Sequence, residues 1–202
     1  MKHTARALFL GTLLVGAFGL GTLWSQDAGQ GADDPMAQWI KFTSPNENHA
    51  RLEFLAGEWD VAGKFYTVPG QPPAENKGTC TRTWILGKRW LDQRFSSDFM
   101  GTPYEGFGLD GWDPLKQRYV SLWTDTMGAG FYVSEGKWDA ASSTLKLQGE
   151  WPDPMTGPGA TSKVRMELKQ NANGSVVMKM FETKKDSPER LTMEMTYTRK
   201  AQ

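Results

Sequence analysis

Four side chains that could take part in chemistry share one face of a predicted strand. Tyr119, Ser121, Trp123 and Asp125 alternate along the chain, so all four point the same way from a β-strand. If this face lies inside a closed sheet, Asp125 becomes a polar anchor for a ligand, or an acid or base with a raised pKa. The simpler interpretation is that Asp125 ends the strand and caps the Met127–Gly128 turn. No catalytic residue is therefore assigned, and Asp125 is only a weak candidate.

A second group of side chains could line a pocket. Met178, Met180, Met193 and Met195 occur at alternate positions of two later strand-like segments. Thioether side chains adapt their shape and suit tolerant apolar pockets, although plain core packing is the commoner use of methionine at this spacing. Together with Tyr119, Trp123 and Asp125, they form the predicted ligand-binding set.

Metal, thiol and nucleotide chemistry have little support. Outside the leader, His49 is the only histidine, and Cys80 is the only cysteine in the chain. His49 and Glu53 stand four apart on a predicted helix, which is too few ligands for a zinc site. Gly106-Phe107-Gly108 does not open a helix, so it is no dinucleotide loop. We expect no metal and no cofactor.

Composition and the N-terminus limit the partners and the location. The 202 residues contain 23 basic and 23 acidic side chains, a balance that argues against nucleic-acid binding. Residues 1–25 have the basic start, apolar stretch and polar end of a signal peptide, which predicts export to the periplasm or secretion. An uncleaved leader would be the only membrane contact. Residues 26–43 read as a flexible spacer with a short amphipathic segment, followed by one domain over 44–202.

The elements that position these side chains begin with a short helix. Ser44 suits the N-cap, Pro45 the first helical position and Glu47 the third, which predicts a helix from there to about Ala56. Gly57 offers a left-handed residue at which the helix can stop.

After Trp59 the apolar period becomes two, and turn signals recur about every 8 to 14 residues. We expect ten strands, at 58–68, 75–86, 89–99, 104–110, 117–126, 130–138, 144–151, 161–169, 175–183 and 189–199. No connection could hold a crossover helix, so the pattern predicts an all-β, up-and-down antiparallel barrel with the short helix across one end. Closure removes the exposed edges that ten strands in an open sheet would leave.

Several short motifs support a resemblance that covers nearly all of this domain, from His49 to Arg199. They are Leu52-x-x-Leu55-x-Gly57-x-Trp59, Leu109-Asp110-Gly111-Trp112-Asp113-Pro114, Trp123-Thr124-Asp125-Thr126, Glu135-Gly136 and Thr156-Gly157-Pro158. In order and spacing they resemble the bacterial domain-of-unknown-function family 1579, which is similar to the calycin group of lipocalin-like and nitrobindin-like β-barrels. The resemblance implies no known activity.

The same resemblance implies roles for three residues. In calycins, a G-x-W on the first strand closes one barrel end and an arginine on the last strand packs over the tryptophan; Gly57, Trp59 and Arg199 match. Their implied role is structural. Nitrobindin-like barrels hold haem through a late-strand histidine. This chain has no histidine after His49, so haem is not expected, and Tyr197 or Met195 would be the alternative ligands.

Three functions remain open at this point. The first is an exported barrel that binds a small apolar molecule in its interior. The second is a hydrolase or isomerase that uses a pocket carboxylate, with Asp125 as its best residue. The third is a filled barrel that acts as an interaction module of the cell envelope. The amount of space inside the barrel separates the first from the third.

Overall fold

The structure is a computed structural model, which describes residues 34–201 apart from 100, 129, 154–155 and 185–186. The predicted signal peptide and the first part of the spacer lie outside these residues. The chain divides into one unit that ends at Gln38 and a second that starts at Trp39. Helix α1 (Pro35–Thr43) crosses this boundary, and the second unit contains every element that follows it. No helix in the described part of the chain has the length and apolar character needed to cross a membrane.

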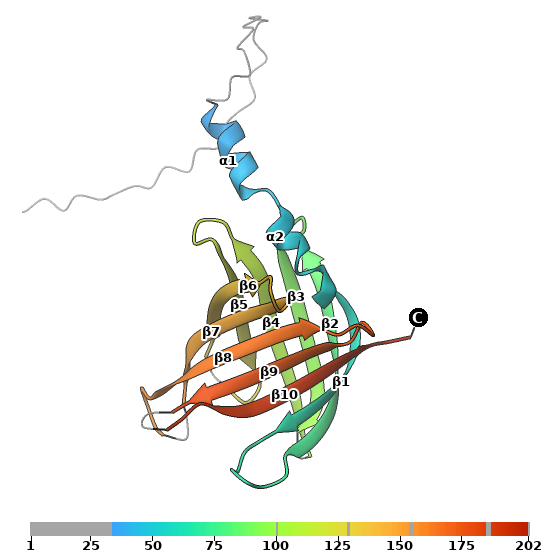
Figure 1. Cartoon of the computed structure of the whole chain (residues 1–202), viewed down its shortest axis with the longest axis vertical. Coiled ribbons are helices and arrows are strands. Elements are labelled where there is room, and N and C mark those ends of the chain that lie inside the picture. The colour runs from blue at the N-terminus through green and yellow to red at the C-terminus, as the bar shows by residue number, and fades with distance from the viewer. Residues whose placement is uncertain (1–33, 100, 129, 154–155, 185–186, 202) are drawn as a thin grey trace, which may run out of the picture. The chain divides into compact units, whose positions relative to one another are not determined.

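Ten antiparallel strands form one closed barrel (Figure 1). Their bounds are β1 Gly57–Phe65, β2 Ala74–Ile85, β3 Trp90–Phe99, β4 Thr102–Asp113, β5 Arg118–Asp125, β6 Tyr132–Asp139, β7 Thr144–Pro152, β8 Thr161–Gln170, β9 Val176–Thr183 and β10 Arg190–Arg199. Each strand pairs with its neighbours in the chain, and β1 pairs with β10 to close the barrel. The all-β, up-and-down prediction is confirmed.

Strand β4 is longer than the sequence pattern predicted. It begins at Thr102 and includes Pro103, which the turn signals had placed in a loop. Pro103 pairs with Asp98 of β3, whereas pairing with β5 begins only at Gly106. The missing N–H of the proline therefore costs no ladder hydrogen bond, because this part of β4 has one neighbouring strand instead of two.

The predicted single helix is wrong in its start and in its continuity. The cap of α2 (Glu47–Ala50) is Asn46, not Ser44. The Asn48 N–H donates to Asn46 Oδ1 at 2.9 Å, and the Asn46 N–H donates to His49 Nδ1 at 3.1 Å. A capping box therefore exists two residues later than predicted, because Ser44 Oγ is used by α1, where it donates to the Ile40 carbonyl at 2.6 Å. A separate 3₁₀ turn, η1 (Glu53–Leu55), follows α2.

One end of the barrel is closed by α2, η1 and the start of β1 (Figure 1). Leu52, Leu55 and Trp59 are almost completely buried there. Trp59 Nε1 donates to the Leu55 carbonyl at 3.0 Å, which ties the 3₁₀ turn to the first strand. The guanidinium carbon of Arg199 lies 4.3 Å from the Trp59 ring centroid, and its Nη1 donates to the Ala56 carbonyl at 2.9 Å.

Gly57 has a different role from the helix stop that was predicted. It opens β1 with φ of 126°, and a Cβ there would lie 2.5 Å from Arg199 Nη1. The position therefore needs glycine both for its backbone conformation and for the close approach of the arginine.

Candidate functional site

The inward side chains of β8, β9 and β10 form an apolar wall. We use the name methionine wall for Met166, Met178, Met180, Met193 and Met195. Met166, Met178 and Met195 are buried, whereas Met180 and Met193 are partly exposed. Strand register places Met166 beside Met180, Met180 beside Met193, and Met178 beside Met195. Alternate positions on three paired strands therefore place these side chains on one face of the sheet, as the period of two in the sequence predicts.

The facing strands carry polar side chains into the same interior. Arg82, Gln93, Asp110, Ser121 and Ser134 come from five consecutive strands, β2 to β6, and are called the polar girdle here. Arg82 pairs in register with Gln93, and Ser121 pairs with both Asp110 and Ser134. All but Ser121 are classed as buried.

The charges of the girdle are not neutralised by a direct ion pair. Arg82 is 4% exposed and Asp110 is 7% exposed, and no contact within 4.0 Å joins their charged atoms in the described structure. Burial raises the pKa of Asp110, while Arg82 and Ser121 act in the opposite direction. Arg82 instead lies over the Tyr197 ring, 4.8 Å from its centroid. Burial also raises the pKa of Tyr197, to about 12.

Sequence reasoning missed the polar girdle. Arg82 and Gln93 were not singled out, although each stands two positions from a buried apolar residue, Cys80 and Leu91 respectively, on the inward face. The available signal was that polar residues occupy positions of several neighbouring strands at which the alternation places side chains in the core. Their convergence depends on strand register, which alternation alone does not give.

The end of the barrel opposite η1 is lined by large side chains that remain partly exposed. We call this region the mouth, and its members are Phe65, Phe99, Tyr104, Trp123, Tyr132, Trp151, Met180 and Met193. Several rings meet edge to face, with centroids 5.1 Å apart for Phe65 and Phe99. At the plugged end Trp59, Leu55 and Leu91 are each 0% exposed, while Trp84, Trp112 and Trp138, at inward positions of β2, β4 and β6, keep part of their surface exposed. Completely buried side chains therefore occur at the plugged end, whereas the large side chains of the mouth are all partly exposed.

Two glycines of β4 shape the mouth. A Cβ on Gly106 would lie 2.1 Å from Cζ2 of Trp123, and a Cβ on Gly108 would lie 3.1 Å from Cε3 of the same ring. Trp123 is therefore the group that approaches both glycines closely. The ring lies against the wall instead of projecting across the opening.

Asp125 holds the mouth together. Its Oδ2 accepts hydrogen bonds from Tyr104 Oη at 3.0 Å and from Trp123 Nε1 at 2.8 Å. Its Oδ1 accepts from the backbone N–H groups of Met127 and Gly128, both at 2.9 Å. The carboxylate therefore caps the turn and anchors two aromatic side chains at once.

The predicted ligand-binding residues fall into three places. Trp123, Asp125, Met180 and Met193 lie at the mouth, and Met178 and Met195 lie deeper in the methionine wall. Tyr119 is 2% exposed and packs edge to face on Trp112, with ring centroids 5.0 Å apart. Burial raises the pKa of its hydroxyl, and the guanidinium of Arg51, at the end of α2, acts in the opposite direction. Tyr119 therefore belongs to the plugged half of the barrel.

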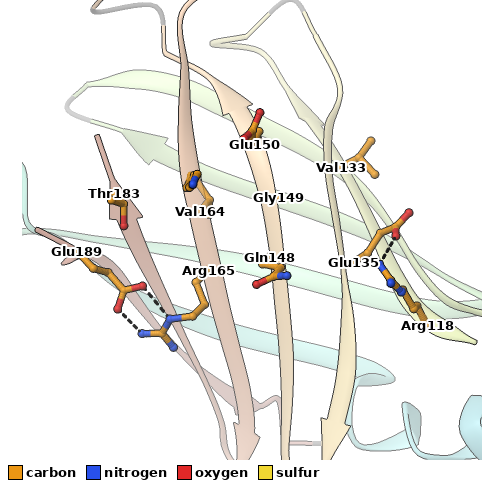
Figure 2. A pocket seen from close by; sticks show the side chains of 11 residues that line it. Arg118, Val133, Glu135, Gln148, Gly149, Glu150, Val164, Arg165, Thr183 and Glu189 are labelled. Carbon is orange, nitrogen blue, oxygen red and sulfur yellow. Dashed lines mark hydrogen bonds and ion pairs between the residues drawn. The ribbon is translucent and has the colours of Figure 1, made fainter. Parts of the chain in front are cut away.

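Two hollows lie on the outer wall. The larger, of about 620 Å³, is lined by outward side chains of β5 to β8 and by residues near β9 and β10. Figure 2 shows two charge pairs there, Arg165 with Glu189 and Arg118 with Glu135, and it draws Glu150 without such a contact. The second, of about 460 Å³, lies over β2 to β5 and includes Arg94 and Phe107. Arg94 is paired with Asp92 at 3.0 Å.

Metal ligands do not gather in the described part of the chain, where no three His, Cys, Asp or Glu side chains could share an ion. His49 is buried at the plugged end, and its Nδ1 accepts the capping hydrogen bond from Asn46. Burial lowers the pKa of His49, with a smaller contribution from Arg89.

Comparison with known proteins adds a family and a fold. Residues 44–199 match the model of a family described as protein of unknown function DUF1579. No curated protein matches the chain. The crystal structure of Rv2717c from M. tuberculosis is similar, with a TM-score of 0.57 and 12% sequence identity, over 78% of this chain and 100% of that one. At this identity the similarity shows the fold alone.

Proposed function

The chain belongs to the DUF1579 family of proteins of unknown function, and because that membership carries no activity, we propose from the geometry that it binds a small, largely apolar molecule inside the barrel. The ligand enters through the mouth. The methionine wall and the aromatic side chains of the mouth hold it.

The exposure of the mouth side chains supports this proposal above any other observation. Trp59, Leu55 and Leu91 are completely buried at the plugged end. At the other end Trp123, Met180 and Met193 point inward and keep part of their surface exposed. Large apolar groups left accessible on a concave lining are typical of binding sites, since covering them with a ligand gains about 25 cal/mol per Å².

The composition of the lining supports a tolerant site. Unbranched methionine side chains change rotamer at little cost and fit different shapes. Trp123 is held flat against Gly106 and Gly108, which keeps its indole face available for stacking. A rigid aromatic side and an adaptable side thus face each other.

The surroundings of Asp125 favour binding over catalysis. A general base needs a free lone pair directed at its substrate, but both oxygens of Asp125 already accept two hydrogen bonds each. Its role in the proposal is to position Tyr104 and Trp123.

A fluorescence titration with N-phenyl-1-naphthylamine, a neutral apolar probe, tests the proposal. We expect saturable enhancement with the wild-type chain and at least a tenfold weaker Kd for Met193→Trp, which fills the mouth. Thr198→Trp is the matched control, since Thr198 is exposed and points outward from the same strand. Absence of saturable binding, or equal affinities for all three proteins, would show that the interior is filled or that the probe sits elsewhere.

A further inference from the structure

Arg82 is a buried cation with unused hydrogen-bond donors. It is 4% exposed, and neither Nε nor Nη1 has an acceptor within hydrogen-bond distance among the described residues. A guanidinium stays protonated in proteins, so it cannot escape this environment by losing its charge. Buried charges are normally paired, because leaving water without a partner is costly.

No ion pair joins Arg82 to a carboxylate among the described residues. Burial lowers the pKa of Arg82, but Tyr197, Cys80 and Asp110 more than offset this effect, so the pKa is raised and the guanidinium stays charged. The Tyr197 ring centroid lies 4.8 Å from the guanidinium carbon. Asp110 lies beyond ion-pair distance, and the burial that raises its pKa favours its neutral form. Cys80 is a buried thiol whose pKa is likewise raised by burial. Nε and Nη1 of Arg82 are therefore left without an acceptor among the described residues.

The position of Arg82 defines what could supply that acceptor. It lies in the polar girdle on β2, while the methionine wall occupies β8 to β10. On β3, Phe95 follows Gln93 towards the mouth, and it packs against Tyr104 and Trp123 with ring centroids 5.8 Å and 6.4 Å away. A ligand that spans these layers meets aromatic and methionine side chains first and the girdle last.

We infer that the molecule bound in the barrel carries a carboxylate, which accepts hydrogen bonds from Arg82, and an apolar tail that extends towards the mouth. This inference rests on the proposed function and specifies its ligand class as a monocarboxylate amphiphile. Among the described residues, Arg82 is the only Lys or Arg that is buried. One cation in a dry interior balances a singly charged acid and leaves a phosphate dianion uncompensated.

Displacement of bound N-phenyl-1-naphthylamine by decanoate, decan-1-ol and acetate tests the inference at pH 7.5. The variants are Arg82→Met, which removes the charge and keeps an unbranched side chain, and Arg94→Met as the matched control on the outer face of β3. Arg82→Gln serves as a second variant that retains polarity without charge. Thermal unfolding of each protein shows that the barrel is intact.

We expect the wild-type protein and Arg94→Met to bind decanoate about ten- to hundredfold more tightly than decan-1-ol, which is the range of a charge-assisted hydrogen bond. The Arg82 variants should bind the two alike and keep the affinity for decan-1-ol. Acetate at equal concentration should not displace the probe.

The contrary results separate the two claims. Equal binding of decanoate and decan-1-ol by the wild type, or an unchanged preference in both Arg82 variants, would overturn the carboxylate inference and leave apolar binding intact. Displacement by acetate as effective as that by decanoate would overturn the need for a tail. Failure of the wild type to bind the probe, decanoate and decan-1-ol would overturn the proposed function, and this inference with it.

Discussion

Replacement of Asp125 by Asn tests whether this residue anchors the mouth. The amide of Asn can keep its oxygen on the two backbone N–H groups of the turn, as Oδ1 does now at 2.9 Å from each. Its NH₂ group then faces Trp123 Nε1, which donates to Oδ2 at 2.8 Å in the wild type. Two donors cannot bond to each other, so the indole N–H loses its acceptor.

The size of the effect follows from that lost bond. A hydrogen bond to a charged group contributes about 1.5–3 kcal/mol, and the half-buried indole N–H cannot be fully rehydrated. For a domain of this size the loss corresponds to a fall in Tm of about 3 to 12 °C. The NMR signal of the Trp123 indole N–H should also move towards the position of a free indole.

Asp113→Asn is the matched control. Asp113 caps its turn through the Leu115 and Lys116 N–H groups, at 2.9 Å and 3.1 Å, and an Asn oxygen can accept both. We expect a change of less than about 0.5 kcal/mol. The anchoring argument is refuted if Asp125→Asn costs no more than Asp113→Asn and leaves the Trp123 signal in place. Loss of a hydrolase or isomerase activity by a correctly folded Asp125→Asn protein would instead restore the enzymatic reading.

Three further changes follow from the packing. Gly106→Ala places a Cβ 2.1 Å from Trp123 and should cost about 1–3 kcal/mol in urea unfolding, whereas Gly130→Ala, with open space around it, should cost little. Arg199→Met removes the contact over the plug tryptophan and should cost about 1–2 kcal/mol by the same assay; no loss would mean that the plug holds by apolar packing alone. Burial lowers the pKa of His49, so the unfolded chain binds a proton more readily, and the free energy of unfolding should fall as the pH drops below about 6.5. His49→Gln should abolish that slope, and an unchanged slope would place its origin elsewhere.

Local patterns carried much of the architecture. Turn residues and the period of two located the ten strands to within a few residues, because a strand with one buried face must alternate. The start of the short helix was misplaced, since Ser44 and Asn46 are both good caps and only the end of α1 decides which one is used. Pro103 was assigned to a loop, since the sequence does not show that β4 has only one neighbour there.

The candidate site was accessible from the sequence only in part. The alternation of Met178, Met180, Met193 and Met195, and that of Trp123 with Asp125, determined which side chains share a face, because parity is a local property of the backbone.

Tertiary structure alone decided what these side chains meet. Closure of the barrel brought Trp59 under Arg199, and strand register placed Arg82 in the interior with Nε and Nη1 lacking an acceptor among the described residues. It also surrounded Asp125 with four donors, which changes a candidate acid or base into an anchor. Register and closure depend on contacts between residues far apart in the chain, and a pattern read along one strand does not contain them.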